Sequence, residues 1–433
     1  MNDSKDIGSL IIEEQKHLQE YSGTGLKYYA NTIRAGQIGR ILGKLRKQEV
    51  ITNIDKIEVF AADVGIIDSR IVSSLYLPEL QRLGAIDVYR DGSGSIIKIE
   101  ENIGSEEDIL RMTGEYWSNN SPAEEECLSL DAIRLCSQIP RLQIELDQEL
   151  VGLGYKNTTL GLELSKNFSL LQAHEIPGIK EPVYHTPYYA REHTQSMIHT
   201  LRGLDKDTRI SVEQLLNYVG KNQATPASSI GFINPEALAC IQRTGLIDAT
   251  QVDTVQGNSE RFLFTPSMWS PLSTPLMSDE QEHVRALLSC VKHGQINPSK
   301  IDGVQVSIRM PEKLIAALLR NKKVGPASPI GTDYIVLEKE GIVNIEESSR
   351  KGRYNMVLIK DDVADRALRI LTHGRDDSLG GESANTNSLV QQSSFENTVQ
   401  ERVKIDTKLR KKPTKYSDAV AKKIIEEFRG GHL

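Results

Sequence analysis

Three cationic side chains and an aromatic ring fall within seven residues in the last quarter of the chain. Arg350, Lys351 and Arg353 surround Gly352, and Tyr354 follows directly. Long cationic side chains neutralise phosphate charge, and a glycine lets the backbone come close to a ligand. The chemistry that this stretch favours is therefore phosphate binding, as on a nucleic-acid backbone. The alternative is a solvated basic turn.

Further residues with related chemistry precede this stretch. The cations among them lie between two predicted helices, and the hydroxyl residues lie early in the second of these helices: Arg320, Lys322, Lys323, Ser328 and Thr332. They suit bonds to phosphates or base edges, but none offers the arginine–guanine or asparagine–adenine pairing that specifies sequence strongly. The alternative is a purely structural role, with Asp333 as a helix N-cap.

A second basic stretch lies near the C-terminus and includes Arg410, Lys411 and Lys412. A flexible basic arm along DNA would add non-specific, salt-sensitive affinity. A short amphipathic helix is predicted over residues 417–429, with apolar side chains at i, i+4 and i+8: Val420, Ile424 and Phe428. Such a stripe favours docking into a groove of a partner protein. The two interpretations are compatible, and we keep both.

Patterns typical of catalysis or metal binding are not visible in the sequence. The densest group of histidines and acids is His185, Glu192, His193 and His199; the last two histidines are six residues apart and would not share a helix face. There is no HExxH, CxxC, GxxxxGK[ST] or GxSxG pattern. The four cysteines sit in apolar, helix-like settings. We therefore expect no catalytic site, no metal and no cofactor, and an unrecognised enzyme site remains only a residual hypothesis.

The elements that would position the phosphate-binding residues are marked by a phrase that recurs three times. It reads as a last helical turn, a glycine suited to positive φ, and a short apolar strand: residues 81–87 (QRLGAID), 242–248 (QRTGLID) and 338–344 (EKEGIVN). After each copy comes a hairpin-like stretch with a glycine at its tip. A second repeat, PASSIG at 226–231 and PASPIG at 326–331, precedes the last two copies. Repeats in the same order favour duplicated modules.

The element order of helix, glycine, strand, turn and strand resembles the second half of a winged helix-turn-helix domain. The resemblance is at the level of the superfamily and covers about half of the chain. It implies a mainly α fold with small β-hairpin wings (α+β), in which a third helix enters the major groove and the wing contacts the backbone. Many members use the same surfaces for protein contacts instead, so the resemblance leaves the partner open.

Composition and patterning set the domain boundaries. Seven segments are predicted: an N-terminal helical segment (1–47), module 1 (48–101), a helical connector (102–205), module 2 (206–268), module 3 (279–373), a disordered linker (374–400) and a basic tail with a short amphipathic helix (401–433). The linker prediction rests on its Ser, Asn, Gly and Gln content. Within module 3 the third helix is expected over residues 327–340, after a turn at 321–324.

Net charge and hydropathy limit the function classes. The net charge of −7 means that any nucleic-acid contact must come from a local basic face. No run of apolar residues is long enough for a membrane span, and we expect a cytoplasmic protein. The sequence favours a non-enzymatic protein that binds double-stranded DNA, mainly through module 3 and the tail. The alternative is an assembly adaptor, whose winged helices and C-terminal helix dock partner subunits or a second copy.

Overall fold

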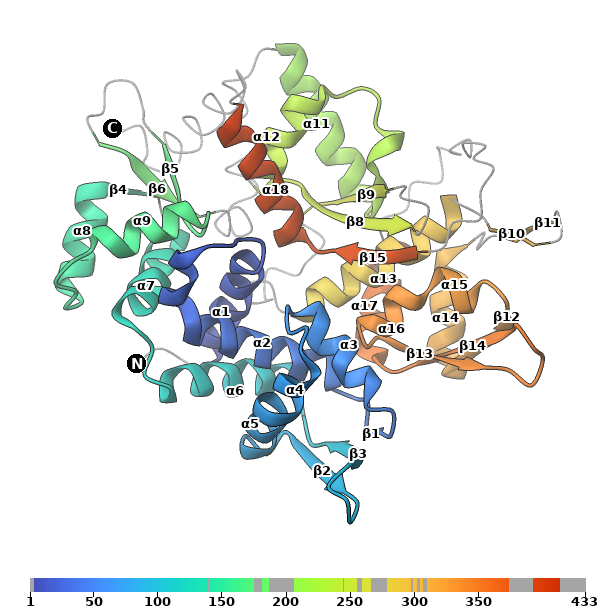
Figure 1. Ribbon diagram of the computed structural model, residues 1–433. Coiled ribbons are helices and arrows are strands. Elements are labelled where there is room, and N and C mark those ends of the chain that lie inside the picture. The colour runs from blue at the N-terminus through green and yellow to red at the C-terminus, as the bar shows by residue number, and fades with distance from the viewer. Residues whose placement is uncertain are drawn as a thin grey trace.

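The protein is mainly helical, with several small antiparallel sheets, as the α+β expectation requires (Figure 1). The computed structural model describes residues 4–138, 140–174, 181–186, 206–243, 245–254, 259–265, 279–296, 299–301, 304–306, 310–373 and 392–412. Their buried apolar side chains form three clusters. One belongs to the N-terminal half, one mainly to module 3, and one to module 2.

Module 1 contains a first helix, a short strand, two further helical segments and a hairpin. Its elements are α2 (Ala30–Leu45), β1 (Val50–Ile51), α3 (Asp55–Asp63), a third helical run of α4 (Ser69–Ile71), η2 (Val72–Tyr76) and α5 (Leu77–Arg82), and the strands β2 (Ile86–Arg90) and β3 (Ile96–Glu101). The sheet has the order β1-β3-β2, so the first strand pairs with the last. The predicted hairpin is confirmed.

Modules 2 and 3 repeat this element order. Module 2 consists of α11 (Lys206–Lys221), β7 (Thr225–Pro226), η5 (Ala227–Ser229), α12 (Pro235–Arg243), β8 (Asp248–Thr254) and β9 (Ser259–Phe264). Module 3 consists of α14 (Pro311–Asn321), β12 (Lys323–Ala327), α15 (Ile330–Asp333), α16 (Ile335–Lys339), β13 (Val343–Glu347) and β14 (Tyr354–Leu358). In both sheets the first strand again pairs with the last strand of the hairpin.

The recurring glycine phrase has one local structure in all three copies. Gly84, Gly245 and Gly341 have φ of 71°, 77° and 67°, as predicted. In each copy the residue after the glycine donates its backbone N–H to a carbonyl five residues earlier, at 3.0, 3.2 and 2.9 Å. This bond satisfies a carbonyl that the helix end leaves open. The phrase thus ends a helix and starts a strand by the same mechanism each time.

Other boundaries differ from the sequence prediction. The N-terminal segment is not separate, because α2 takes the place in module 1 that α11 and α14 take in the other modules. In module 3 the expected turn at 321–324 is largely strand β12, and the expected single third helix is two short ones, α15 and α16. The α13 helix (Asp279–Ile296) lies within the range predicted for module 3 but precedes this element order. The hairpin of β10 (Ser299–Ile301) and β11 (Val304–Val306) separates it from α14.

The predicted linker and tail also differ from the structure where it describes them. Residues 392–396 form β15 (Gln392–Glu396), and α18 (Thr398–Lys411) follows with a buried face. We call residues 392–412 the C-terminal arm. Residues 374–391 and 413–433, including Val420, Ile424 and Phe428, lie outside the described residues. The polar composition of 392–400 suggested a linker, but these residues gain backbone pairing from a strand far away in the sequence.

A tight three-helix group supports module 1. α1 (Ser4–Leu18) packs against α2 and against α6 (Glu106–Asn119), which follows the hairpin of module 1. The connector continues with α7 (Glu124–Gln138), β4 (Arg141–Leu142), α8 (Gln143–Gly152), α9 (Thr159–Asn167), β5 (Gln172–His174) and β6 (Val183–His185). The α17 helix (Asp361–His373) follows the module 3 hairpin as α6 follows that of module 1. It packs against α13 and α14.

His17, at the end of α1, makes stability sensitive to acid. Burial lowers its pKa to about 3, and the charges of Arg402 and Lys16 act in the same direction. The folded state therefore binds fewer protons than the unfolded state below pH ~6.5. The stability that the neutral imidazole contributes is present above pH ~6.5 and is lost progressively as the pH falls toward 3. We expect the decrease in unfolding free energy between pH 7.5 and pH 5, measured with denaturant, to be smaller in His17→Gln than in the parent. An equal decrease in both proteins would contradict this expectation.

Candidate nucleic-acid interface

The hairpin of module 3 presents the predicted cations at its tip. Arg350, Lys351 and Arg353 are exposed, and Gly352 allows the turn with φ of 73°. Backbone bonds close the turn, since Ser348 donates to the Arg353 carbonyl at 2.8 Å. Among the described residues, none of the three cations has a carboxylate partner. The tip is therefore a closed turn with three cations available to an external anion.

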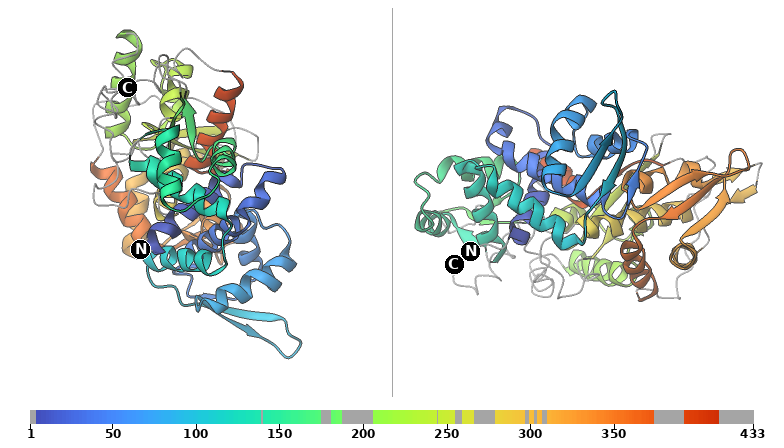
Figure 2. Two further views of the ribbon diagram at one scale, coloured as in Figure 1. Left: turned by 90° about the vertical axis from the view of Figure 1, so that its left-hand side faces the viewer. Right: turned by 90° about the horizontal axis from the view of Figure 1, so that it is seen from below.

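This hairpin stands away from the body of the protein. In Figure 1 its tip is at the right, whereas the β2–β3 hairpin of module 1 points downward. The view from below shows the same separation between the light-blue and the orange hairpin (Figure 2). A projecting loop can approach a nucleic-acid backbone without a clash from the rest of the fold.

The structure places Tyr354 at the start of β14, next to the turn of this hairpin, whereas Ser328 follows β12 and Thr332 lies in α15. Tyr354 is opposite Ala327 in the sheet, and its ring packs against Gly331, where an added Cβ would lie 2.3 Å from the ring. This ring serves packing, so its predicted role in DNA contact is not supported. Thr332 is exposed and donates to Asp333 at 2.8 Å. Asp333 ends α15 and does not cap α16, whose N-cap is Tyr334.

The other predicted cations of module 3 lie at the far end of the sheet. Lys323 is opposite Val357, near the end of β14, and pairs with Glu346 at 2.6 Å. Lys322 pairs with Asp361 at 3.2 Å. Arg320 is exposed at the end of α14. The sequence prediction joined these cations to the hairpin tip, but strand β12 separates the two groups because the residues read as a turn are extended.

The third helix of module 3 is covered by module 1. α16 packs against α3 and β15, and Val336 and Leu337 are buried. Lys44 on α2 pairs with Glu340 at 2.7 Å, and Gln48 donates to the Gly341 carbonyl at 3.1 Å. An added Cβ at Gly341 would lie 2.6 Å from the Lys44 carbonyl oxygen. This helix is therefore not available to a DNA groove.

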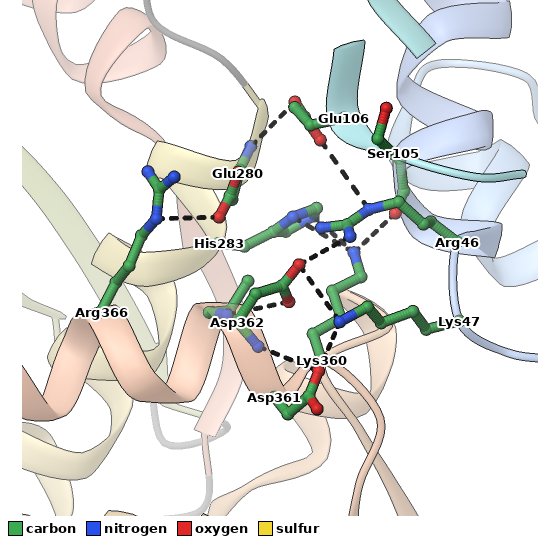
Figure 3. A network of polar contacts seen from close by, with 12 residues as sticks. Arg46, Lys47, Ser105, Glu106, Glu280, His283, Lys360, Asp361, Asp362 and Arg366 are labelled. Atoms are coloured by element: carbon green, nitrogen blue, oxygen red, sulfur yellow. Dashed lines mark hydrogen bonds and ion pairs between the residues drawn. The ribbon is translucent and has the colours of Figure 1, made fainter. Parts of the chain in front are cut away.

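A network of ions fixes module 1 on module 3 in this arrangement (Figure 3). Arg46 pairs with Asp362 at 2.6 Å, and Lys47 pairs with Asp361 and with Asp362. The hydrogen bond from Lys47 holds the pKa of Asp361 well below its usual range. Lys360 is fully buried and donates to the Gly43 carbonyl at 2.6 Å. The network spans α2, α13 and α17, so the two modules form one packed unit.

The third helix of module 2 is also covered, by the C-terminal arm. α18 packs along α12 and β8, and Ile405 and Leu409 join the apolar cluster of module 2. The predicted basic tail is therefore partly structural: Arg410 pairs with Asp406 at 2.6 Å and donates to the Lys166 carbonyl. Lys411 and Lys412 remain exposed at the helix end.

Module 1 has the most exposed third helix among the described residues. Arg70 in its first turn has an 89% exposed side chain and bonds to the N-cap Asp68. Ile67 and Ile71 are 91% and 44% exposed. Residues 50–101 include five lysines and arginines but nine aspartates and glutamates. An exposed apolar surface on a module with more acids than bases suits a protein partner better than DNA.

The described residues contain no group of three or more metal-ligating side chains, and His193 and His199 lie outside them. A cavity of about 20 Å³ lies between α1, α2, α13, α16 and the arm, which is room for about one water molecule. Its cations Lys16, Arg40 and Lys44 have nearby carboxylates. Among the helices that the structure describes, none is long and apolar enough to cross a membrane.

Comparison with families of known proteins, with curated proteins and with solved structures found no match for this chain.

Proposed function

We propose that this chain is a non-enzymatic protein that binds double-stranded DNA through tandem winged-helix modules. The order of helix, strand, two helices and hairpin recurs three times, and each first strand pairs with the last strand of the hairpin. This topology supports the winged-helix assignment. Phosphate contacts would come mainly from the hairpin of module 3.

The observation that carries the proposal is the tip of that hairpin. Its three cations are exposed, unpaired among the described residues and held on a closed turn. Because α16 is buried, module 3 would contact the backbone through its wing and would not read bases through its third helix. We therefore expect binding with little sequence preference and a strong salt dependence.

Charge reversal at the hairpin tip tests this proposal. We expect Arg350→Glu, Lys351→Glu and Arg353→Glu together to weaken binding to duplex DNA at least about tenfold at 0.1 M salt, because phosphate contacts are lost. The slope of log affinity against log salt should become shallower by about 0.9 for each lost contact. Fluorescence anisotropy with a labelled duplex over a salt series measures both quantities.

A matched control changes the net charge by the same amount elsewhere. Lys27, Lys156 and Lys166 are exposed cations outside the modules, and their replacement by glutamate should leave most of the affinity and the slope intact. Equal losses in both triple variants would show that only net charge matters. An unmodified chain that does not bind duplex DNA, or binds it without salt dependence, would refute the proposal.

The adaptor function remains the second candidate because of the free third helix of module 1. The exposed isoleucines at its start and the excess of acids in the module as a whole favour a protein ligand. A stoichiometric partner that stays bound to the hairpin-tip variant, and is lost when Ile67 and Ile71 become aspartate, would favour the adaptor over the DNA-binding protein.

A further inference from the structure

The C-terminal arm completes module 2 from a distant part of the sequence. β15 pairs antiparallel with β8, with Phe395 opposite Val252 and Glu396 opposite Gln251. α18 then lies over β8 and α12 (Figure 1), and its Ile405 and Leu409 are buried in the apolar cluster of module 2. The arm thus occupies a docking site made of a strand edge and a helix.

Two buried carboxylates hold the arm in this site. Asp248, at the start of β8, accepts hydrogen bonds from Arg402 of the arm at 2.7 Å and from Arg285 of α13 at 2.6 Å. Asp406 of the arm pairs with Arg243 of α12 at 2.7 Å and accepts a hydrogen bond from Ser169. These contacts orient the arm, and the charges are matched across the interface.

The same interface leaves several buried polar atoms without partners. In the described structure, both side-chain polar atoms of Gln242 and the Nε and Nη1 of Arg402 are buried and make no hydrogen bond. Each such group lowers the stability of the docked arm, because it loses its bonds to water and gains none in exchange. The docking of the arm is therefore less favourable than its buried apolar contacts imply.

Release of the arm would leave β8 as a free sheet edge, because β15 is its outer neighbour in the order β15-β8-β9-β7. A free edge of this kind pairs readily with a strand from another chain. The arm of a second copy has the same strand, the same isoleucine and leucine, and the same arginine for Asp248. The 18 residues 374–391 that join the arm to α17 reach at most about 60 Å when fully extended.

We propose that the C-terminal arm is exchangeable and that two copies of this chain form a dimer by reciprocal arm exchange. Each arm then occupies the docking site on module 2 of the other copy, with the contacts described above. Exchange of an identical element is a low-cost route to a dimer because it needs no new interface. The inference does not depend on DNA binding.

A disulfide between the arm and β8 tests the exchange in the full chain. Ser394 lies opposite Asp253, and the Ser394 hydroxyl is 2.7 Å from the Asp253 carboxylate. With both positions changed to cysteine, a closed monomer forms the disulfide within one chain, whereas an exchanged dimer forms it between two chains. We expect the disulfide-linked dimer on non-reducing gels to increase with protein concentration. When two versions of the two-cysteine chain that differ in mass are mixed, we expect a disulfide-linked heterodimer to form.

Control variants separate exchange from accidental linkage or misfolding. Ser394→Cys alone should give no concentration-dependent dimer beyond that of the parent. Arg402→Met in the two-cysteine background should speed exchange at least about tenfold, the equivalent of 1.4 kcal/mol lost from the closed state. Arg402→Lys keeps a charge and should have a smaller effect. Intrachain disulfides alone at every concentration, or no disulfide at all, would overturn the proposal.

Discussion

Replacing Asp248 with alanine is expected to lower the free energy of unfolding by about 3–5 kcal/mol. The carboxylate is about 1% exposed and pairs with Arg285 and Arg402, whose side chains are 0% and 3% exposed. Without it Arg285 keeps its bond to Glu282 at 2.8 Å, whereas Arg402 has no other ion pair among the described residues. An uncompensated buried charge is far more costly than the pair itself is worth. Denaturant unfolding followed by circular dichroism measures the change.

The repeat supplies the matched control for this prediction. Asp87 occupies the same place in the module 1 phrase but is exposed and accepts only a bond from Asn102 at 2.9 Å. Asp87→Ala should therefore change stability by less than about 1 kcal/mol. Combining Asp248→Leu with Arg402→Met should restore part of the loss, since apolar groups can replace a buried pair. Equal effects at positions 87 and 248 would show that burial of the charges does not matter.

Replacing Gly8 with alanine should destabilise the protein by about 3 kcal/mol or more. α1 and α6 cross so closely that a Cβ on Gly8 would lie 1.9 Å from the Leu110 carbonyl oxygen. On the facing helix, a Cβ on Gly114 would lie 1.9 Å from the Ser4 carbonyl oxygen. The obstacles are backbone atoms, so the helices themselves must separate. The separation would open the core that supports module 1. Thermal or denaturant unfolding measures the loss.

Gly152 provides the control for helix propensity. It ends α8, and a Cβ there would meet no atom within 4 Å. Alanine at this position should be neutral or stabilising by up to about 1 kcal/mol, as expected for an open helical site. If Gly8→Ala behaved in the same way as Gly152→Ala, the close crossing of α1 and α6 would be wrong.

Much of the local structure was predictable because it depends on neighbouring residues. The positive φ of Gly84, Gly245 and Gly341 and the hairpin of module 1 follow from a glycine and alternating apolar residues within a few positions. The errors came from extended segments with weak local signals. β12 contains Gly325 and Pro326 and reads as a turn, and β15 reads as a linker; both are strands because a partner strand pairs with them.

The candidate site shows the same division between local and distant causes. The hairpin-tip cations were visible in the sequence, because a turn with three cations and a glycine is a local pattern. Their separation from Arg320, Lys322 and Lys323 was not visible, since it depends on the extension of β12. The segments that cover α12 and α16 are far from these helices in the sequence. No local sequence pattern identifies such contacts.

By itself the sequence determined that a helix–glycine–strand unit occurs three times and that one copy leads into a cationic hairpin. Only the tertiary structure decided whether corresponding positions of the three copies are exposed, buried or bonded to another module. Asp87 is exposed, Asp248 is buried between two arginines, and Asn344 accepts a hydrogen bond from Lys56 of module 1. The physical reason is that backbone conformation follows from adjacent residues, whereas burial and charge pairing follow from elements that meet only when the chain folds.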